Sequence, residues 1–501
     1  MRRLWIAAIV LALALVGSCR WLLPERFAVN APIGHMLFGR GASTPAPDTL
    51  GKRFHAPEGH AVGLFAGSLE NPRMLRFTSA GDLLVSAPRS GRILLALRDD
   101  DGDGSADGVR TLLEGLSRPH GMDFHEGWLY VAETDGIGRI EFDPATRETR
   151  GTYQRVVNGL PSGGNHWSRT VRFGPDGWMY VSIGSSCNVC EEEDPRRAAI
   201  VRYRPDGSGE EIVARGLRNS VGLDWQPGTD QLYATDNGRD LLGDDFPPCE
   251  LNRIVMGGFY GWPYANGDRV PDPDFGAGNE ARVQSSIPPV HGFRAHNAPL
   301  GIVFLRGDDL AEPLRGAALV ALHGSWNRTH KDGYKVVSLH WDDDGGVSSR
   351  DFLTGFLDGD DVIGRPVDVA QGPDGAIYVS DDYAGAIYRV ARSSGGKASA
   401  TANAAPAAAA KDPLADLPAA ERAASAERGR ALFEANGCAG CHDAARAQAG
   451  VVAVKLQGLG ARYSIDSLIA FLAAPTPPMP PVELAAEARR DLAVHLLAEH
   501  P

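Results

Sequence analysis

The sequence has few cysteines, no excess of basic residues and no apolar run long enough to predict a membrane span. Lysine and arginine number 50 against 63 aspartates and glutamates, and the net charge is −13. This balance argues against nucleic acid or an anionic lipid surface as the main partner. The chain has 501 residues, of which 43% are hydrophobic and 60 are glycine. This composition indicates a globular, turn-rich protein with room for one large and one small domain.

The N-terminus has the charge and hydropathy pattern of an export signal. Met1-Arg2-Arg3 precedes an apolar stretch from Leu4 to Gly17, so residues 1–18 are predicted to be a signal peptide or a lipoprotein signal. Val16-Gly17-Ser18-Cys19 resembles a bacterial lipobox. Either Cys19 is lipidated, or the signal is cleaved in the ordinary way or stays attached. We therefore expect a periplasmic protein and leave open whether a Cys19 lipid or the N-terminal segment anchors it to the membrane.

Only six cysteines are present. Cys187 and Cys190 form a Cys-x-x-Cys pair without a following histidine. In an oxidising compartment such a pair is expected to form a short-range disulfide. Cys249 is then either a buried free thiol or a competitor for one member of that pair.

The segment Cys438-Ala439-Gly440-Cys441-His442 carries the most specific chemical signal. Cys-x-x-Cys-His is the attachment motif of a c-type haem. Cys438 and Cys441 are predicted to form the thioethers, and His442 to bind the iron. The alternatives are a redox dithiol or half of a zinc site, but no second pair at zinc spacing lies nearby.

The residues around this motif predict a small helical domain. Residues 393–418 are rich in Ala, Ser and Pro, as expected for a flexible linker. Helices are predicted over 423–436, 464–473 and 483–499, the last with Leu484, Ala488, Leu492 and Leu496 on one face. Residues 421–501 therefore resemble a small all-α cytochrome c domain.

The sixth iron ligand is predicted within the segment Pro477-Pro478-Met479-Pro480-Pro481. Prolines stiffen this loop and can hold the Met479 sulfur toward the iron. His442 with Met479 is a ligand pair that raises the haem potential. The alternatives are His495, His500 or no sixth ligand.

From residue 60 to 392 the sequence contains about six loose repeats at roughly 50-residue spacing. Each unit has a short apolar strand, a Gly/Asp turn and a second strand with a Tyr-Val or Leu-Val ending. Turn segments of this kind are Gly174-Pro175-Asp176-Gly177 and Gly372-Pro373-Asp374-Gly375. The period and the alternating strands predict an all-β six-bladed β-propeller, whose functional site is expected at the channel mouth.

Three segments of this region resemble a known enzyme family. They are His166-Trp167-Ser168-Arg169, Leu217-Arg218-Asn219-Ser220-Val221-Gly222, and Asp236-Asn237-Gly238-Arg239 followed by Glu250-Leu251-Asn252. In order and spacing they are similar to segments of the soluble glucose and sorbosone dehydrogenases. Those are six-bladed propellers that use pyrroloquinoline quinone (PQQ).

The resemblance implies a role for each matched residue. His166 would take the substrate hydroxyl proton, and Arg218, beside Asn219, would stabilise charge on the accepting quinone. Arg365 matches a cofactor-contacting arginine, and Arg328 and Lys335 are weaker matches because the family's lysine is not clearly present. The alternative for each basic residue is a solvated surface charge. Consecutive main-chain carbonyls of Gly238 and Arg239 would bind calcium, although the family has proline at the second position.

Together these features predict a periplasmic quinohaemoprotein that oxidises a sugar or sugar aldehyde, with glucose or sorbosone as the type. PQQ and calcium would serve the propeller, and electrons would pass to the covalent haem and then to a respiratory acceptor. One rival is a lactonase-like six-bladed hydrolase, which leaves the haem unexplained. The other is a non-catalytic propeller that binds a partner and presents a haem.

Overall fold

We describe a computed structural model of the chain. It describes residues 28–30, 41–307, 310, 313–342, 344–393, 413–414, 417–442, 446, 456, 459, 463–473 and 484–500. Cys19 and Met479 lie outside this part. Internal contacts divide the chain into two compact units, residues 1–395 and 396–501. Among the described residues, no helix is both long enough and apolar enough to cross a membrane.

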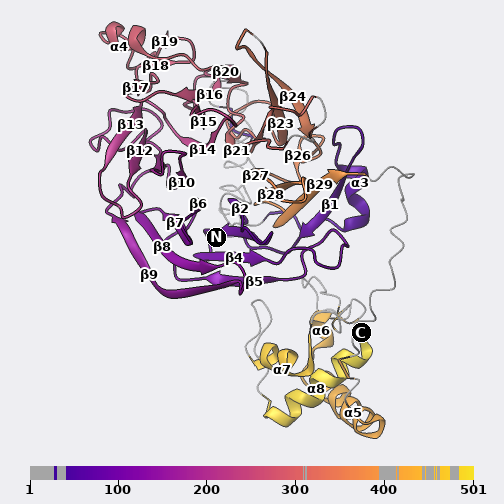
Figure 1. Cartoon of the computed structure of the whole chain (residues 1–501). Coiled ribbons are helices and arrows are strands. Elements are labelled where there is room, and N and C mark those ends of the chain that lie inside the picture. The colour runs from indigo at the N-terminus through magenta and orange to yellow at the C-terminus, as the bar shows by residue number, and fades with distance from the viewer. Residues whose placement is uncertain are drawn as a thin grey trace, which may run out of the picture. The chain divides into compact units, whose positions relative to one another are not determined.

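The first unit is a six-bladed β-propeller, as predicted from the repeats (Figure 1). The four strands of each blade pair antiparallel. Blade 1 consists of β2 (Leu75–Phe77), β3 (Leu83–Ala87), β4 (Arg92–Ala96) and β5 (Val109–Leu113). Blade 2 consists of β6 (Met122–His125), β7 (Trp128–Glu133), β8 (Gly136–Asp143) and β9 (Glu148–Asn158). Blade 3 consists of β10 (Arg169–Phe173), β11 (Met179–Ile183), β12 (Ala199–Tyr203) and β13 (Glu211–Arg215), with β17 (Gly258–Phe259) added in parallel.

The remaining blades follow the same plan. Blade 4 consists of β14 (Ser220–Trp225), β15 (Leu232–Asp236), β16 (Cys249–Ile254) and β20 (His291–Phe293). Blade 5 consists of β21 (Pro299–Phe304), β22 (Ala318–Leu322), β23 (Lys335–Trp341) and β24 (Val347–Leu353). Blade 6 consists of β27 (Pro366–Gln371), β28 (Ile377–Asp381), β29 (Ala386–Arg392) and β1 (His60–Ala66). Outside the blades lie η2 (Pro47–Thr49), α3 (Leu50–Arg53), α4 (Glu280–Ser285), and the short pairs β18 (Ala265–Asn266) with β19 (Val270–Pro271) and β25 (Leu357–Asp358) with β26 (Asp361–Val362).

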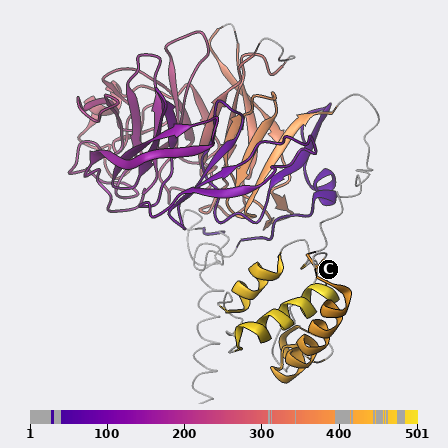
Figure 2. The same cartoon turned by 60° about the horizontal axis from the view of Figure 1, so that its bottom comes forward.

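The ring is closed by the two ends of the propeller sequence. Strand β1 pairs antiparallel with β29, from His60 opposite Arg392 to Ala66 opposite Ile387. In Figure 2 the indigo first strands therefore lie beside the orange last strands. This pairing covers an edge that would otherwise be exposed.

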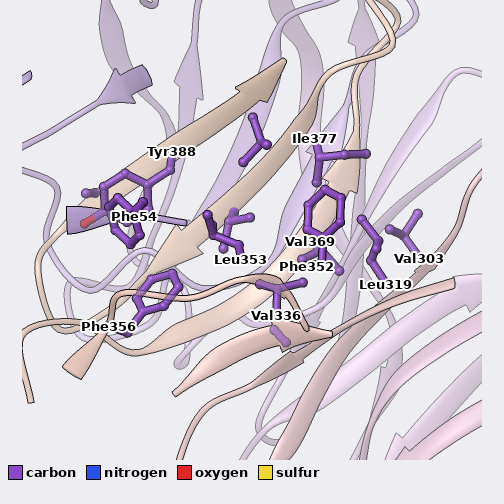
Figure 3. Packing of buried hydrophobic residues seen from close by; sticks show 14 of the residues in the cluster. Phe54, Val303, Leu319, Val336, Phe352, Leu353, Phe356, Val369, Ile377 and Tyr388 are labelled. Carbon is purple, nitrogen blue, oxygen red and sulfur yellow. The ribbon is translucent and has the colours of Figure 1, made fainter. Parts of the chain in front are cut away.

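Buried side chains fill the spaces between blades. One cluster joins Val303, Leu319 and Val336 of blade 5 to Val369 and Ile377 of blade 6 (Figure 3). The Gly-Pro-Asp-Gly turns that recur in the sequence connect the first two strands of a blade. Gly177 and Gly375 have φ of 75° and 76°, a conformation that glycine adopts without steric cost.

Acidic side chains on the inner strands join the blades around the central channel. Asp123, Asp224 and Asp368 each accept a hydrogen bond from a backbone N–H of the following blade. The donors are Phe173, Phe304 and Leu75, at 2.8, 2.7 and 2.8 Å. Arginines on or just after the inner strands pair with two of these aspartates: Arg76 with Asp123, and Arg172 and Arg306 with Asp224.

The second unit is helical. It contains α5 (Ala419–Ala435), α6 (Ala439–His442), α7 (Ile465–Ala473) and α8 (Ala486–Glu499). Helix α8 differs from its prediction: it begins at Ala486, and residues 492–497 are all buried rather than only one face. Tertiary packing on several sides explains this burial, because α8 contacts both α5 and α7.

Candidate functional site

The predicted functional residues lie just before inner strands, and therefore at one end of the channel. His166 precedes β10, Arg218 and Asn219 precede β14, and Arg365 precedes β27. A cavity of about 970 Å³ lies at the other end and includes the residues that follow these strands, such as Pro175, Gln226 and Gly372. The structure thus places the candidate site and this cavity at opposite ends of the channel.

His166 is held as a neutral imidazole. Its Nδ1 lies 2.9 Å from the Ser185 carbonyl oxygen and 3.0 Å from Ser185 Oγ. Because a carbonyl only accepts, Nδ1 carries the hydrogen and Nε2 is left with its lone pair. Burial and the nearby Arg218 lower the pKa of His166 to about 3. Nε2 is therefore unprotonated at neutral pH, and the lowered pKa also makes it a weaker base than a free imidazole.

Arg218 is fixed by hydrogen bonds from its whole guanidinium group. Its Nε donates to the Asn188 carbonyl at 2.9 Å, and Nη2 donates to Asn188 Oδ1 at 3.0 Å and Asp240 Oδ2 at 2.9 Å. Its Nη1 donates to the carbonyls of Gly238 at 2.9 Å and Asn237 at 3.2 Å. The Arg218 guanidinium group is consequently buried and held in one orientation.

Asn219 lies against His166 across a glycine. The Asp236 carboxyl group accepts the backbone N–H groups of Arg218 at 2.9 Å and Asn219 at 2.7 Å. A Cβ on Gly184 would lie 2.4 Å from Asn219 Oδ1 and 2.6 Å from the His166 Cβ, so only glycine fits there. Asn219 Oδ1 is buried without a hydrogen-bond partner in the structure, which suits a donor from a bound group.

Arg365 takes the same position in blade 6 that Arg218 takes in blade 4. Asp381 accepts its backbone N–H at 2.9 Å, as Asp236 does for Arg218. The Arg365 Nη2 atom lies 3.0 Å from Nδ1 of His323. His323 Nε2 in turn lies 3.0 Å from Asp382 Oδ1.

This chain of contacts continues to residues that sequence reasoning missed. Asp382 Oδ2 accepts from Arg73 Nη1 at 2.8 Å, and Arg73 Nη2 lies 3.4 Å from His120 Nε2. Burial, together with Arg365, lowers the pKa of His323 to about 3. A signal was present, because Arg73 and His120 lie in the segments that open the first two repeats.

Arginines gather around Trp167, the neighbour of His166. The Arg118 guanidinium lies 4.1 Å from the ring centroid and that of Arg73 lies 5.9 Å away. Burial, Arg73 and Arg89 lower the pKa of Arg118. Such a collection of guanidinium groups is suited to binding carboxylates.

Among the described residues, the two weaker candidates, Arg328 and Lys335, do not contact the other predicted cofactor-binding residues. Arg328 donates to the carbonyls of Asp244, Ala295 and His330, so it fastens loops. Lys335 Nζ pairs with Asp351 Oδ1 at 2.6 Å. Since Asp351 lies on β24, the last strand of blade 5, the Lys335 ammonium group is used to join β23 to β24.

Of the two predicted calcium-binding carbonyls, both within the described residues, only that of Gly238 is located by a contact with another predicted site residue. The Gly238 carbonyl faces the cluster, because it accepts from Arg218. The Arg239 side chain is turned to a buried pair, with Nη1 at 2.7 Å from both carboxylate oxygens of Asp272. Asp240, which pairs with Arg218, adds a carboxylate to the same loop.

The other cysteine predictions are resolved. Cys187 and Cys190 form a disulfide, as predicted. Cys249 is a buried free thiol, and burial raises its pKa to about 11. It therefore does not compete for the pair.

The haem motif lies in one helical turn. The His442 N–H donates to the Cys438 carbonyl at 3.0 Å, so Cys438, Cys441 and His442 are grouped at α6. Met479 lies outside the described residues. His495, an alternative ligand, is buried in α8 with its ring centroid 5.8 Å from that of Phe433.

Comparison with family models gives two matches. The TrAA12-like model matches residues 54–245 and 272–393. The Cytochrome c model matches residues 426–497, which confirms the expected haem c domain.

Individual relatives agree with these matches. An uncharacterized protein of Borreliella burgdorferi is 30% identical over 363 residues, 69% of this chain and 93% of that protein. A pyrroloquinoline quinone-dependent pyranose dehydrogenase of Coprinopsis cinerea is 26% identical over 417 residues, 68% of this chain but only 55% of that enzyme. The calcium structure of the Trichoderma reesei family AA12 enzyme has a TM-score of 0.60 at 22% identity, covering 71% of this chain and 99% of that one.

The repeats and the closed six-bladed ring thus agree with the family match. The chain belongs to the TrAA12-like family, among the PQQ-dependent sugar dehydrogenases that its sequence resembles, and carries a C-terminal cytochrome c domain.

Proposed function

We propose that the propeller oxidises a sugar or sugar aldehyde, of the glucose or sorbosone type, with PQQ and calcium, and passes the electrons to the haem of the same chain. The observation that carries this proposal is the juxtaposition of a neutral, half-buried His166 and an oriented Arg218 at one channel mouth. A redox domain in the same chain gives the electrons an outlet. The names of relatives, including the Coprinopsis pyranose dehydrogenase, support the substrate class.

The residues fit the requirements of hydride abstraction from a hydroxyl carbon. PQQ, when bound, supplies a carbonyl group that accepts the hydride. His166 Nε2 takes the hydroxyl proton as the hydride leaves, and its lowered pKa keeps Nε2 unprotonated before the reaction. Arg218 stabilises the negative charge that develops, and its fixed orientation avoids reorganisation during the reaction.

The remaining groups would hold the cofactors. Arg365, Arg73 and Arg118 would pair with the carboxylates of PQQ, and the orphan Asn219 Oδ1 would accept from it. Gly238 and Arg239 carbonyls would bind calcium, with Asp240 as a nearby carboxylate. Calcium at Gly238 requires Arg218 to share or release that carbonyl.

We further propose that the protein works in the periplasm, where covalent haem attachment and the Cys187–Cys190 disulfide are both expected. Anchoring to the membrane, by a lipid on Cys19 or by the N-terminal segment, is part of this proposal. The haem would then deliver electrons to a respiratory acceptor.

The test is to load the purified holo-cytochrome with PQQ and calcium and to add aldoses while recording the haem spectrum. Aldose-dependent haem reduction that needs both PQQ and calcium is the expected result. Lactone hydrolysis without PQQ would instead favour the hydrolase. No reduction with any sugar or sugar aldehyde would contradict the proposal.

A further inference from the structure

A disulfide-closed turn lies directly behind the two catalytic side chains of the proposed reaction. Cys187 and Cys190 enclose Asn188 and Val189 just after β11. Disulfides stabilise folds more when they close longer loops. A bridge between residues three positions apart therefore acts mainly on local conformation.

Ser185 connects this turn to both catalytic groups. It accepts the His166 Nδ1 hydrogen, and its Oγ donates to the Cys187 carbonyl at 2.7 Å. Its backbone N–H donates to the Arg218 carbonyl at 2.8 Å. The base and the arginine are thus fastened to the same short segment.

Asn188 makes the largest set of these contacts. Its Oδ1 accepts from Arg218 Nη2 at 3.0 Å and from the Asp240 N–H at 2.8 Å, while its Nδ2 donates to the Asp240 carbonyl at 3.1 Å. Its own carbonyl accepts from Arg218 Nε at 2.9 Å and from Trp262 Nε1 at 3.4 Å. Asn188, in blade 3, therefore fixes the orientation of the Arg218 guanidinium group and the position of the loop after β15.

We propose that Asn188 is a positioning residue of the dehydrogenase, and that the Cys187–Cys190 disulfide holds it in the conformation that aims Arg218. The catalytic role of Asn188 rests on the proposed function, whereas its positioning of Arg218 does not. Without the Asn188 side chain, Arg218 keeps fewer fixed acceptors and can turn away from the developing charge. Catalysis depends steeply on such orientation.

The first experiment measures Arg218 itself, without PQQ or calcium. Phenylglyoxal modifies accessible arginines, and peptide mass spectrometry reports the rate at each site. Asn188→Ala should raise the Arg218 modification rate several-fold, and Asn188→Asp, which keeps the acceptor, should restore it. The controls are Asn158→Ala, at an exposed residue of β9, and Arg306 at the other channel end, whose rate should stay constant. An unchanged Arg218 rate in Asn188→Ala would overturn the proposal.

The second experiment follows turnover of the PQQ-loaded protein. Asn188→Ala and the double variant Cys187→Ser/Cys190→Ser should lower kcat about tenfold or more with little change in KM, and Asn188→Asp should recover most of kcat. A kcat that is unaffected in both variants would overturn the role. If the wild-type protein shows no PQQ-dependent turnover, the proposed function fails, and the Arg218 modification rates still support or overturn the positioning.

Discussion

At the scale of single residues, the site depends on buried groups whose charge is set by their partners. His166 is neutral because burial and Arg218 oppose its protonation. An unperturbed histidine would lose its base function near pH 6.5. We therefore expect no acid-side loss of kcat/KM from His166 between neutral pH and about pH 5, measured as aldose-dependent haem reduction.

Substitution of the base tests its role directly. His166→Asn should lower kcat about 10²- to 10⁴-fold, because the proton then has no positioned acceptor. The thermal unfolding temperature should change little, since an amide can still donate to the Ser185 carbonyl. His55→Asn, at an exposed histidine, is the matched control. Full activity of His166→Asn would remove the histidine from the mechanism.

Glu250 gives a prediction for stability. Burial raises its pKa from the ordinary 4.5 to about 7, so between these values the folded state holds a proton that the unfolded state has lost. Stability from this group therefore falls as the pH rises through that window. A protonated Glu250, or a glutamine, can donate to Asn252 Oδ1, which has no partner in the structure.

Glu250→Gln should accordingly flatten the pH dependence. We expect its free energy of unfolding to exceed that of the wild type by on the order of 1–3 kcal/mol at pH 8, and to match it near pH 5. Urea unfolding of the propeller at the two pH values measures the difference. Parallel curves for the two proteins would show that Glu250 ionises normally.

At this scale the sequence predicted only part of the site. His166, Arg218 and Asn219 were predicted because their flanking segments resemble a family, and the structure places all three at one channel end. Arg73, His120, His323 and Asp382 were missed, because contacts between residues up to 309 positions apart bring them together. Lys335 was predicted as a weaker cofactor contact, and its residue type could not show that its ammonium group pairs with Asp351.

At the scale of elements, helix packing in the cytochrome unit depends on a close crossing of α5 and α8. A Cβ at Gly429 would lie 2.1 Å from the Asp491 carbonyl oxygen and 2.6 Å from the His495 Cβ. Ser425 and Arg428 also bind the Asp491 carboxylate. The backbones can approach this closely only because residue 429 has no side chain.

Gly429→Val should therefore destabilise the helical unit by about 1–3 kcal/mol, because the overpacked helices must move apart. Thermal unfolding followed in the haem absorbance measures this change, with Ala420→Val on the exposed part of α5 as control. Equal unfolding temperatures for the two variants would show that the crossing tolerates a side chain.

Elements were predicted best where a local signal defined them. The Pro-Asp-Gly turns predicted the repeat, and two cysteines only three positions apart predicted the disulfide. The pairing of β1 with β29 was not predicted, because it joins segments about 330 residues apart and leaves no local pattern. Helix α8 was predicted to within three residues at its start, but its burial on more than one face was not predicted, since α5 and α7 both contact it.

At the scale of the whole molecule, the propeller presents two different channel ends. Acidic inner-strand residues bind the blades together, and the arginines of the other end bind Asp123 and Asp224. The site end instead concentrates guanidinium groups with orphan polar atoms. Under the proposed function, a cytochrome c domain in the same chain would give the oxidation an electron acceptor at fixed stoichiometry.

The most direct measurement is single-turnover haem reduction over a range of protein concentrations. Protein loaded with PQQ and calcium is mixed with an aldose in a stopped-flow instrument. If each propeller reduces its own haem, the rate constant is independent of protein concentration, and a Cys438→Ser/Cys441→Ser variant still reduces an added dye. A rate that rises in proportion to protein concentration, or no aldose-dependent haem reduction, would contradict electron transfer from the propeller to the haem of its own chain.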